Sequence, residues 1–231
     1  MKPFHFQKFV INQDQNVFRV GTDGVLLGSL ASVENSKNIL EVGTGTGLIS
    51  LMVAQRNSAA KILALDINIE AVHLAEENFK NSPFEKQLTA KHVDFNRFEG
   101  AEKFDLIISN PPYFVGNSSE KDIFARQQTA LTFTDLIKNA AAHLSDNGVF
   151  SVIIPFEDGV FFEKQCMEFN LKLHRKIRIF GIKNSKPKRW IFEFGFKEQF
   201  PEEKDFIIEK SPRIYTEEYL NLTKDFHLFK K

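Results

Sequence analysis

The stretch NILEVGTGTGLISLMVAQR, residues 38–56, contains the signal that decides the fold. Its opening NILEVG is short and largely apolar, as is typical of a buried β-strand. Three glycines, at 43, 45 and 47, then allow the backbone to turn sharply. From Gly47 onward, apolar residues such as Leu48 and Leu51 recur at helical spacing. The stretch therefore predicts a strand, a glycine loop and a helix.

The alternation of strand and helix continues along the chain. Apolar runs predict strands, and residues repeated at three and four predict helices between them. The expected strands after the first are 61–68, 88–95, 104–110, 149–155, 171–181 and 188–196. The expected later helices are 69–82, 132–148, with Gly148 as its end, and a helix near 160–169. This order predicts an α/β protein with a doubly wound, mostly parallel, seven-stranded sheet. No helix separates the last two strands, so we expect them to form an antiparallel edge.

Composition narrows the class of protein. A chain of 231 residues suits one main domain. The 30 basic and 30 acidic residues balance, so an anionic partner must be met by a local patch. No apolar run approaches membrane length, and the N-terminal MKPFHFQKFV lacks the core of a signal peptide. We expect a soluble, cytoplasmic protein.

Cysteine and histidine usage argues against a metal. Cys166 is the single cysteine, which excludes disulfides within the chain and cysteine-based zinc sites. The six histidines never fall at the spacing of two ligands on one helix face. We therefore expect no metal.

The glycine loop and two carboxylates suggest a nucleoside ligand. Ligands of open α/β sheets bind beyond the carboxyl ends of the strands. The Gly-x-Gly-x-Gly spacing differs from the nicotinamide dinucleotide fingerprint, which needs a glycine where this chain has Leu48. Glu41, two residues before the loop, favours a ligand with an ammonium group. Asp66 lies 19 residues after Gly47, about where a carboxylate accepts hydrogen bonds from the hydroxyl pair of a ribose. Asp94 follows the third strand, where its carboxylate can accept a hydrogen bond from an adenine amino group.

The sequence NPPY, residues 110–113, follows the fourth strand. One group that two neighbouring acceptors can recognise is the N6 amine of adenine. This amine is a poor nucleophile because its lone pair is delocalised into the ring. The side-chain oxygen of Asn110 and the carbonyl of Pro111 are acceptors that can take both amino hydrogens. Tyr113 then offers a face for an unstacked base, worth roughly 1–3 kcal/mol. The alternative is a simple turn, because Asn-Pro often begins one.

Together, the glycine loop, Asp66, Asp94 and the Asn-Pro-Pro-Tyr motif resemble class I S-adenosylmethionine-dependent methyltransferases. Further stretches resemble the bacterial tRNA(Val) adenine-N6-methyltransferases over nearly the whole chain. They are FRVGTDGVLLGSLA (18–31), ARQQTALTFTDLI (125–137), KPKRWIFEF (186–194) and YLNLTKDFHLF (219–229). One departure is Gln127, where the family tends to have an aromatic residue or histidine.

The resemblance implies S-adenosylmethionine as cofactor, tRNA as partner, a Rossmann-like fold and a monomer. Residues 1–37 are then an N-terminal extension packing on the core, and residues 38–231 are the methyltransferase domain with a C-terminal tail. The implied catalytic residues are Asn110, Pro111 and Tyr113. The implied cofactor contacts are Thr22, Gly24, Glu41, Gly43, Thr44, Gly45, Gly47, Asp66, Ile67, Asp94, Phe95 and Asn110. The implied substrate contacts are Pro112, Tyr113, Arg126, Lys186, Lys188 and Arg189.

The charge distribution agrees with an RNA substrate. From Leu171 to Phe192 the chain has eight basic residues and no acidic one. They are residues 172, 175, 176, 178, 183, 186, 188 and 189. The alternative is an edge strand protected by lysines against aggregation. Trp190 begins an apolar alternation with Phe192 and Phe194, so we expect it in the core rather than as a platform for a base.

Two other functions stay open from the sequence. The NPPY motif also occurs in enzymes that methylate the glutamine amide of release factors, although the 37 residues before the first core strand are too few for their helical domain. A catalytically idle module that retains the cofactor pocket is the second alternative.

Overall fold

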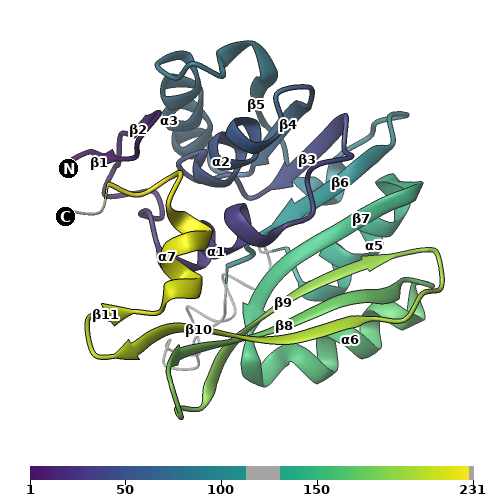
Figure 1. Ribbon diagram of the computed structural model, residues 1–231. Coiled ribbons are helices and arrows are strands. Elements are labelled where there is room, and N and C mark those ends of the chain that lie inside the picture. Colours follow the sequence, from purple (N-terminus) through teal and green to yellow (C-terminus); the bar gives the residue numbers. More distant parts are fainter. Residues whose placement is uncertain (113–130, 229–231) are drawn as a thin grey trace, which may run out of the picture.

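A computed structural model describes residues 1–112 and 131–228 of the chain (Figure 1). In this part of the chain, a two-stranded ribbon accompanies a nine-stranded sheet with the order β11-β10-β8-β9-β7-β6-β3-β4-β5. The ribbon strands are β1 (Phe4–His5) and β2 (Val10–Ile11). The sheet strands are β3 (Asn38–Val42), β4 (Lys61–Asp66), β5 (Leu88–His92), β6 (Phe104–Ser109), β7 (Leu144–Pro155), β8 (Lys172–Ile182), β9 (Pro187–Gly195), β10 (Glu202–Ser211) and β11 (Ile214–Tyr215).

Helices cover both faces of the sheet (Figure 1). The helices are α1 (Thr22–Leu30), α2 (Leu48–Arg56), α3 (Ile69–Lys80), α5 (Phe133–His143), α6 (Gly159–Glu168) and α7 (Glu217–Thr223). Three single 3₁₀ turns are η1 (Glu85–Gln87), η2 (Phe95–Arg97) and η3 (Phe156–Asp158). Side chains from α1, α2, α3 and α7 bury against one face, and side chains from α5 and α6 bury against the other. The molecule is thus a three-layered α/β sandwich.

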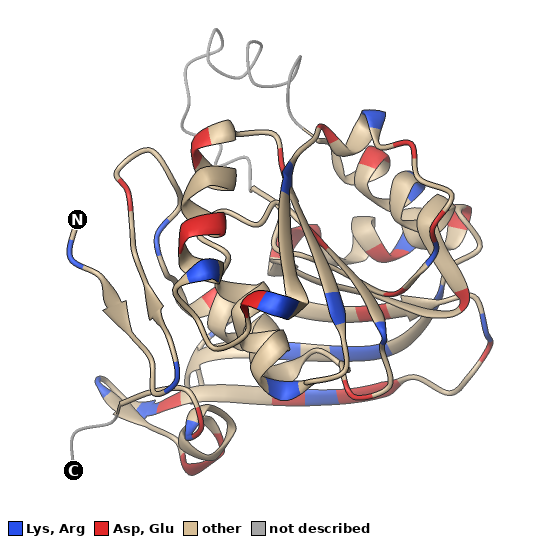
Figure 2. Cartoon of the chain, turned by 90° about the horizontal axis from the view of Figure 1, so that it is seen from above, with Lys and Arg blue, Asp and Glu red and all other residues tan. Residues whose placement is uncertain are grey.

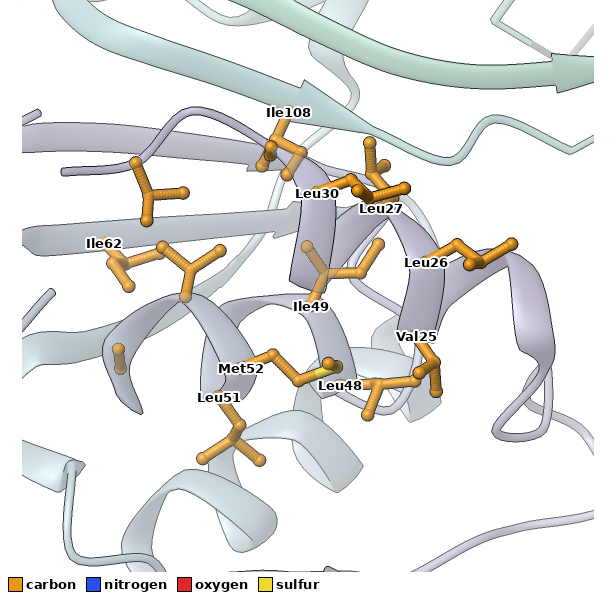
Figure 3. Close-up of a cluster of buried hydrophobic side chains, with 14 of the residues drawn as sticks. Val25, Leu26, Leu27, Leu30, Leu48, Ile49, Leu51, Met52, Ile62 and Ile108 are labelled. Carbon is orange, nitrogen blue, oxygen red and sulfur yellow. The ribbon is translucent and has the colours of Figure 1, made fainter. Parts of the chain in front are cut away.

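Successive residues of the central strands point to opposite layers, as strand geometry requires. Ile39 belongs to the core under α1 and α2, and its neighbour Leu40 belongs to the core over α5 and α6. Figure 3 shows part of the first core, to which α1 contributes Leu26 and Leu27 and α2 contributes Met52. In the second core, Cys166 of α6 is completely buried. Both faces of the central strands β3 and β6 are therefore buried, which explains why these strands read as largely apolar runs.

The order of the strands reverses between β3 and β6. From β3 the chain winds outward through β4 to β5, then returns to place β6 and β7 on the other side of β3. All four contacts in this group of five strands are parallel. A crevice opens at such a reversal, beyond the carboxyl ends of the strands, and ligands of doubly wound sheets bind there.

The predicted fold class is confirmed, and the predicted number of strands is wrong. The last two predicted strands are β8 and β9, and they pair antiparallel as expected. They do not form the edge, because β10 adds in parallel to β8 and β11 then pairs antiparallel with β10. The tail expected after residue 198 thus contributes two strands and α7, and it extends the sheet to nine strands among the described residues.

The helix predicted over 132–148 ends five residues early. Strand β7 begins at Leu144, which pairs with Phe104 of β6. Gly148 lies inside this strand, where a Cβ would come within 2.7 Å of the Phe104 carbonyl oxygen. Its glycine therefore permits a close approach of two strands, and it does not end a helix.

The N-terminal ribbon and the C-terminal helix lie side by side (Figure 1). Phe6 forms an isolated antiparallel bridge with His227, and the Gln7 backbone N–H donates to the Phe226 carbonyl at 2.9 Å. Phe6 and Phe226 are both buried in the core under α1 and α2. The two ends of the described chain thus complete one core.

The described residues contain neither a membrane-spanning helix nor a cluster of metal ligands. No helix there combines the length and apolar character needed to cross a membrane. No group of three or more His, Cys, Asp or Glu side chains in the same residues is placed to hold a metal ion.

Candidate active site

The centre of the candidate site is the reversal point between β3 and β6. Val42 at the end of β3 pairs with Ser109 at the end of β6, and the Ser109 hydroxyl donates to the Val42 carbonyl at 2.9 Å. Gly43 and Asn110 are the next residues on these two strands. Because neighbouring strands lie about 4.8 Å apart, the glycine loop and the Asn-Pro-Pro segment start side by side.

The structure brings most of the predicted motif residues to this edge. Asn110 is partly exposed, Pro111 is buried and Pro112 is exposed. Two predicted site residues, Tyr113 and Arg126, lie outside the described residues.

The glycine loop combines an open half with a packed half. Gly43, Gly45 and Gly47 all have positive φ, at 78°, 55° and 80°, which side chains other than glycine rarely adopt. A Cβ on Gly43 or Gly45 would meet nothing within 4 Å, whereas one on Gly47 would come 2.5 Å from the Phe79 ring. The first two glycines therefore leave a cradle open to a ligand, and the third lets α3 pack against the loop.

Glu41 is buried beneath the loop, with 1% of its surface exposed. Its Oε2 accepts from the Thr44 hydroxyl at 2.8 Å, from the Ser50 N–H at 3.1 Å and from the Ser50 hydroxyl. Its Oε1 is buried and has no hydrogen-bond partner among the described residues. Burial raises the pKa of Glu41 to about 7. The negative charge that the sequence suggested thus depends on pH and on what binds at Oε1.

Asp66 holds the glycine loop in shape. Its Oδ2 accepts from the Gly45 N–H at 2.9 Å, and its Oδ1 accepts from the Asn68 N–H at 2.9 Å. This second role was not predicted from the sequence, because it depends on contact between the ends of β3 and β4. Ile67, the next residue, is 54% exposed at the same edge.

Asp94 lies after β5 at the same edge. Its Oδ1 accepts from the Asn96 N–H at 2.9 Å and so caps η2, and its Oδ2 lies 3.8 Å from Arg97 Nε. The neighbouring Phe95 is buried in the core over α5 and α6, where its ring lies near Phe98. The carboxylate of Asp94 is partly exposed, so it keeps access to a ligand.

Helix α1 begins at Thr22 and brings Gly24 close to the residue that follows the glycine loop. Gly24 faces α2 so closely that a Cβ there would lie 3.0 Å from Leu48, the residue that follows the loop. Asp23, between them, pairs with Arg189 of β9 at 2.8 Å between Oδ2 and Nε. The two stretches that carry much of the resemblance, TDGVLLG and KPKRW, therefore meet in space.

The basic segment is largely neutralised. Lys and Arg residues lie among Asp and Glu residues over the chain (Figure 2). Five of the eight predicted basic residues have acidic partners within 4.0 Å. The pairs are Lys172 with Glu198, Arg175 with Glu193 and Glu202, Lys176 with Glu163, Arg178 with Asp205, and Arg189 with Asp23. Two of these six pairs, those of Glu202 and Asp205, involve β10, which the sequence did not reveal.

Three lysines of the basic segment stay exposed. Lys183, Lys186 and Lys188 lie in and beside the turn between β8 and β9, and we call them the hairpin lysines. This turn stands at the carboxyl end of β8, on the side of the sheet where β3 and β6 end. Trp190 is half-buried, stacks on Phe156 and Phe192 and packs on the core over α5 and α6, as predicted.

Comparison with solved structures shows which known fold this chain shares. The fold is similar to the crystal structure of a predicted O-methyltransferase from Agrobacterium tumefaciens, with a TM-score of 0.70. The match covers 88% of this chain and 96% of that one, at 19% identity, and it supports the fold of a methyltransferase.

Sequence comparison then gives the family. Residues 11–160 match the model of the methyltransferase small domain, and the chain belongs to this family. A relative from a Flavobacteriaceae bacterium (strain 3519-10), named tRNA1(Val) (adenine(37)-N6)-methyltransferase, is 54% identical over 99% of this chain and 100% of its own length. A relative of the same name from Flavobacterium psychrophilum is 41% identical over 97% of this chain and 99% of its own. The predicted resemblance is confirmed.

Proposed function

We propose that this protein transfers a methyl group from S-adenosylmethionine to the N6 amine of an adenine in tRNA. The substrate proposed is tRNA(Val), at the adenine beside the anticodon, as the names of the relatives suggest. The observation that carries the proposal is the adjacency of Gly43 and Asn110 at the reversal point of the sheet. This adjacency supports a site in which a cofactor cradle lies beside a pair of acceptors suited to an exocyclic amine.

The residues present fit S-adenosylmethionine. The cradle at Gly43 and Gly45 lacks any atom where a Cβ would stand. The buried Oε1 of Glu41 has no partner among the described residues and suits an ammonium group or an ordered water beside it. Asp66 and Asp94 would hold the ribose and adenine, with Ile67 and Phe95 beside them. When bound, this cofactor supplies an electrophilic methyl carbon on a sulfonium.

The role of the chain's own residues is to orient the target adenine and the cofactor. The Asn110 side-chain oxygen and the Pro111 carbonyl accept the two amino hydrogens of the target adenine and localise its lone pair. Proline fixes the backbone that carries the second acceptor. Tyr113 and Pro112 provide the surface for the unstacked base, and Thr22 and Gly24 support the methionine end of the cofactor. No side chain needs to act as a nucleophile.

The hairpin lysines are the phosphate contacts we propose, with Arg126 as a further basic contact. They stay exposed where most of the basic segment is paired. We further propose that the protein is a cytoplasmic monomer in which residues 1–37 extend a domain formed by 38–231. The packing of Phe6, Phe9 and α1 in the same core as α2 supports an extension that packs directly on this domain.

The decisive test replaces the amide acceptor. Asn110→Ala should lower methyl transfer to tRNA at least about 100-fold, the scale for losing one oriented hydrogen-bonding group, because the target amine is no longer oriented. Cofactor affinity, measured by calorimetry, should change less than threefold. Asn221→Ala, an exposed residue of α7, is the matched control. An unchanged transfer rate in Asn110→Ala would refute the amine-positioning role, and methyl transfer to a release factor in place of tRNA would favour glutamine methylation.

A second test concerns RNA contact. Replacing all three hairpin lysines by glutamine should weaken tRNA binding and reduce the slope of log K against log salt by up to about 3, since each phosphate contact contributes about one. The control triple replaces Lys80, Lys86 and Lys91, which are exposed beside the opposite edge of the sheet. Equal slopes in both triples would show that the hairpin lysines make no phosphate contact.

A further inference from the structure

Strands β7 and β9 rise beyond the carboxyl edge of β6 and form a wall beside the candidate site. Ser109, the last residue of β6, is level with Val152 of β7. Strand β7 then continues to Pro155, which pairs with Arg189 of β9. Three residues of strand span roughly 10 Å, so Arg189 stands well past the point where Asn110 leaves the sheet.

The guanidinium of Arg189 reaches from this wall to the first turn of α1. Its Nε lies 2.8 Å from Asp23 Oδ2, and the two side chains are only 30% and 26% exposed. Its Nη1 also donates to the Lys188 carbonyl at 2.8 Å. The next residue of α1, Gly24, packs against Leu48 at the end of the glycine loop. The ion pair thus connects the wall to the turn of helix that borders the cofactor cradle.

The position of Asp23 creates an electrostatic conflict. An acidic residue in the first turn is favourable for α1 itself, because it complements the positive end of the helix. Under the proposed function, the same turn meets the methionine carboxylate of the cofactor. Two negative groups at one turn of a helix repel each other, and partial burial strengthens the repulsion relative to water. Without a cation, Asp23 would oppose cofactor binding.

We propose that Arg189 is a positioning residue for the cofactor: its pairing with Asp23 cancels a negative charge beside the methionine carboxylate and fixes the first turn of α1 against the wall. The inference rests on the proposed function, because it assumes S-adenosylmethionine in the cradle. In this inference Arg189 pairs with Asp23 inside the protein, and the hairpin lysines contact the phosphates of the RNA.

The test is calorimetric titration of S-adenosylmethionine into the full chain without RNA. Arg189→Gln should bind about tenfold more weakly, because it leaves Asp23 uncompensated. Asp23→Asn should bind at least as tightly as the unchanged protein. The double variant Asp23→Asn with Arg189→Gln should return to within about threefold of it. Arg178→Gln, which breaks the Arg178–Asp205 pair of β8 and β10, is the control and should show no change.

Three results would overturn the inference. They are unchanged affinity in Arg189→Gln, a double variant as weak as Arg189→Gln, and weaker binding by Asp23→Asn. The salt dependence of tRNA binding gives an independent reading: Arg189→Gln should keep the slope of the unchanged protein, and a slope reduced by about one would assign Arg189 to a phosphate instead. If the unchanged protein fails to bind S-adenosylmethionine, the proposed function itself falls, which separates the two failures.

Discussion

At the scale of single residues, Glu41 shows how burial changes an ordinary carboxyl group. Three donors converge on its Oε2, and its Oε1 is buried without a hydrogen-bond partner among the described residues. Desolvation favours the neutral form, and the pKa rises to about 7 in spite of these donors. A group with these properties binds an ammonium best above neutral pH, when the carboxylate is formed.

This pKa predicts a specific dependence of stability on pH. Because the folded pKa of about 7 exceeds the ordinary value of 4.5, Glu41 favours the folded state below pH 4.5, and this contribution is lost as the pH rises through 7. Urea unfolding of the protein and of Glu41→Gln should therefore give free energies whose difference changes by about 3 kcal/mol between pH 4.5 and 8. Parallel pH profiles for the two proteins would contradict a raised pKa.

The sequence predicted which residues lie at the candidate site, but it did not predict the hydrogen bonds and ion pairs that these residues make. Asn110, Asp66 and Asp94 each follow a predictable strand, so they could be assigned to one edge of the sheet. The hydrogen bond from the Gly45 N–H to Asp66 and the ion pair between Asp23 and Arg189 join residues 21 and 166 positions apart. Such contacts depend on how strands pair in space, which no local pattern records.

At the scale of elements, the glycine loop divides into residues with open space around them and a residue that packs against α3. Gly45 has a positive φ with open space around it, whereas Gly47 has a positive φ and lies against Phe79 of α3. The same substitution should therefore have different consequences at the two positions.

We expect Gly47→Ala to destabilise the protein by about 3 kcal/mol, from backbone strain and overpacking against Phe79. Gly45→Ala should cost only about 1 kcal/mol, from backbone strain, while its Cβ occupies the cradle and weakens cofactor binding at least about tenfold. Chemical denaturation and calorimetry measure the two effects separately. Equal losses of stability would show that Phe79 moves aside to accept the new methyl group.

The strands that the sequence predicted differ in kind from those it missed. Strands β3, β4 and β6 are apolar because both faces are covered, and their pattern is visible locally. Strand β10, with the sequence EEKDFIIEKS, is half charged. Its Glu202 and Asp205 find Arg175 and Arg178 on β8, so a non-local match of charge accompanies its pairing. The same pairing gives acidic partners to two of the eight basic residues that the sequence presented as one continuous segment.

At the scale of the whole molecule, the ends of the described chain are part of the main core. Phe226 is 3% exposed and packs with Phe6 and Tyr219 in the core under α1 and α2. Burial also raises the pKa of Tyr219 to about 12. Removing the C-terminal segment should therefore affect the fold as well as any contact it makes.

Two phenylalanines of the C-terminal region provide a matched comparison. Phe226→Ala should lower the free energy of unfolding by about 3–5 kcal/mol, because it leaves a cavity in the core. Phe200 is fully exposed between β9 and β10, and Phe200→Ala should change it by less than about 0.5 kcal/mol. Urea titration at one pH measures both. Similar small losses would show that the C-terminal segment packs only loosely on the rest of the molecule.

The general placement of the site followed from the sequence because doubly wound sheets collect ligands at one edge. The wall formed by β7 and β9 did not, since it depends on β7 continuing three residues past its pairing with Ser109. The sequence thus located the edge that carries the glycine loop better than the strands that rise beside it.

The burial of Cys166 has a practical consequence. Its thiol is the only one in the chain, it lies wholly inside the layer between α6 and the sheet, and burial raises its pKa far above the ordinary range. Alkylating reagents need an accessible thiolate, so they can label the protein only while this layer is transiently open. The rate at which Cys166 is alkylated therefore reports how often the core over α5 and α6 opens to solvent.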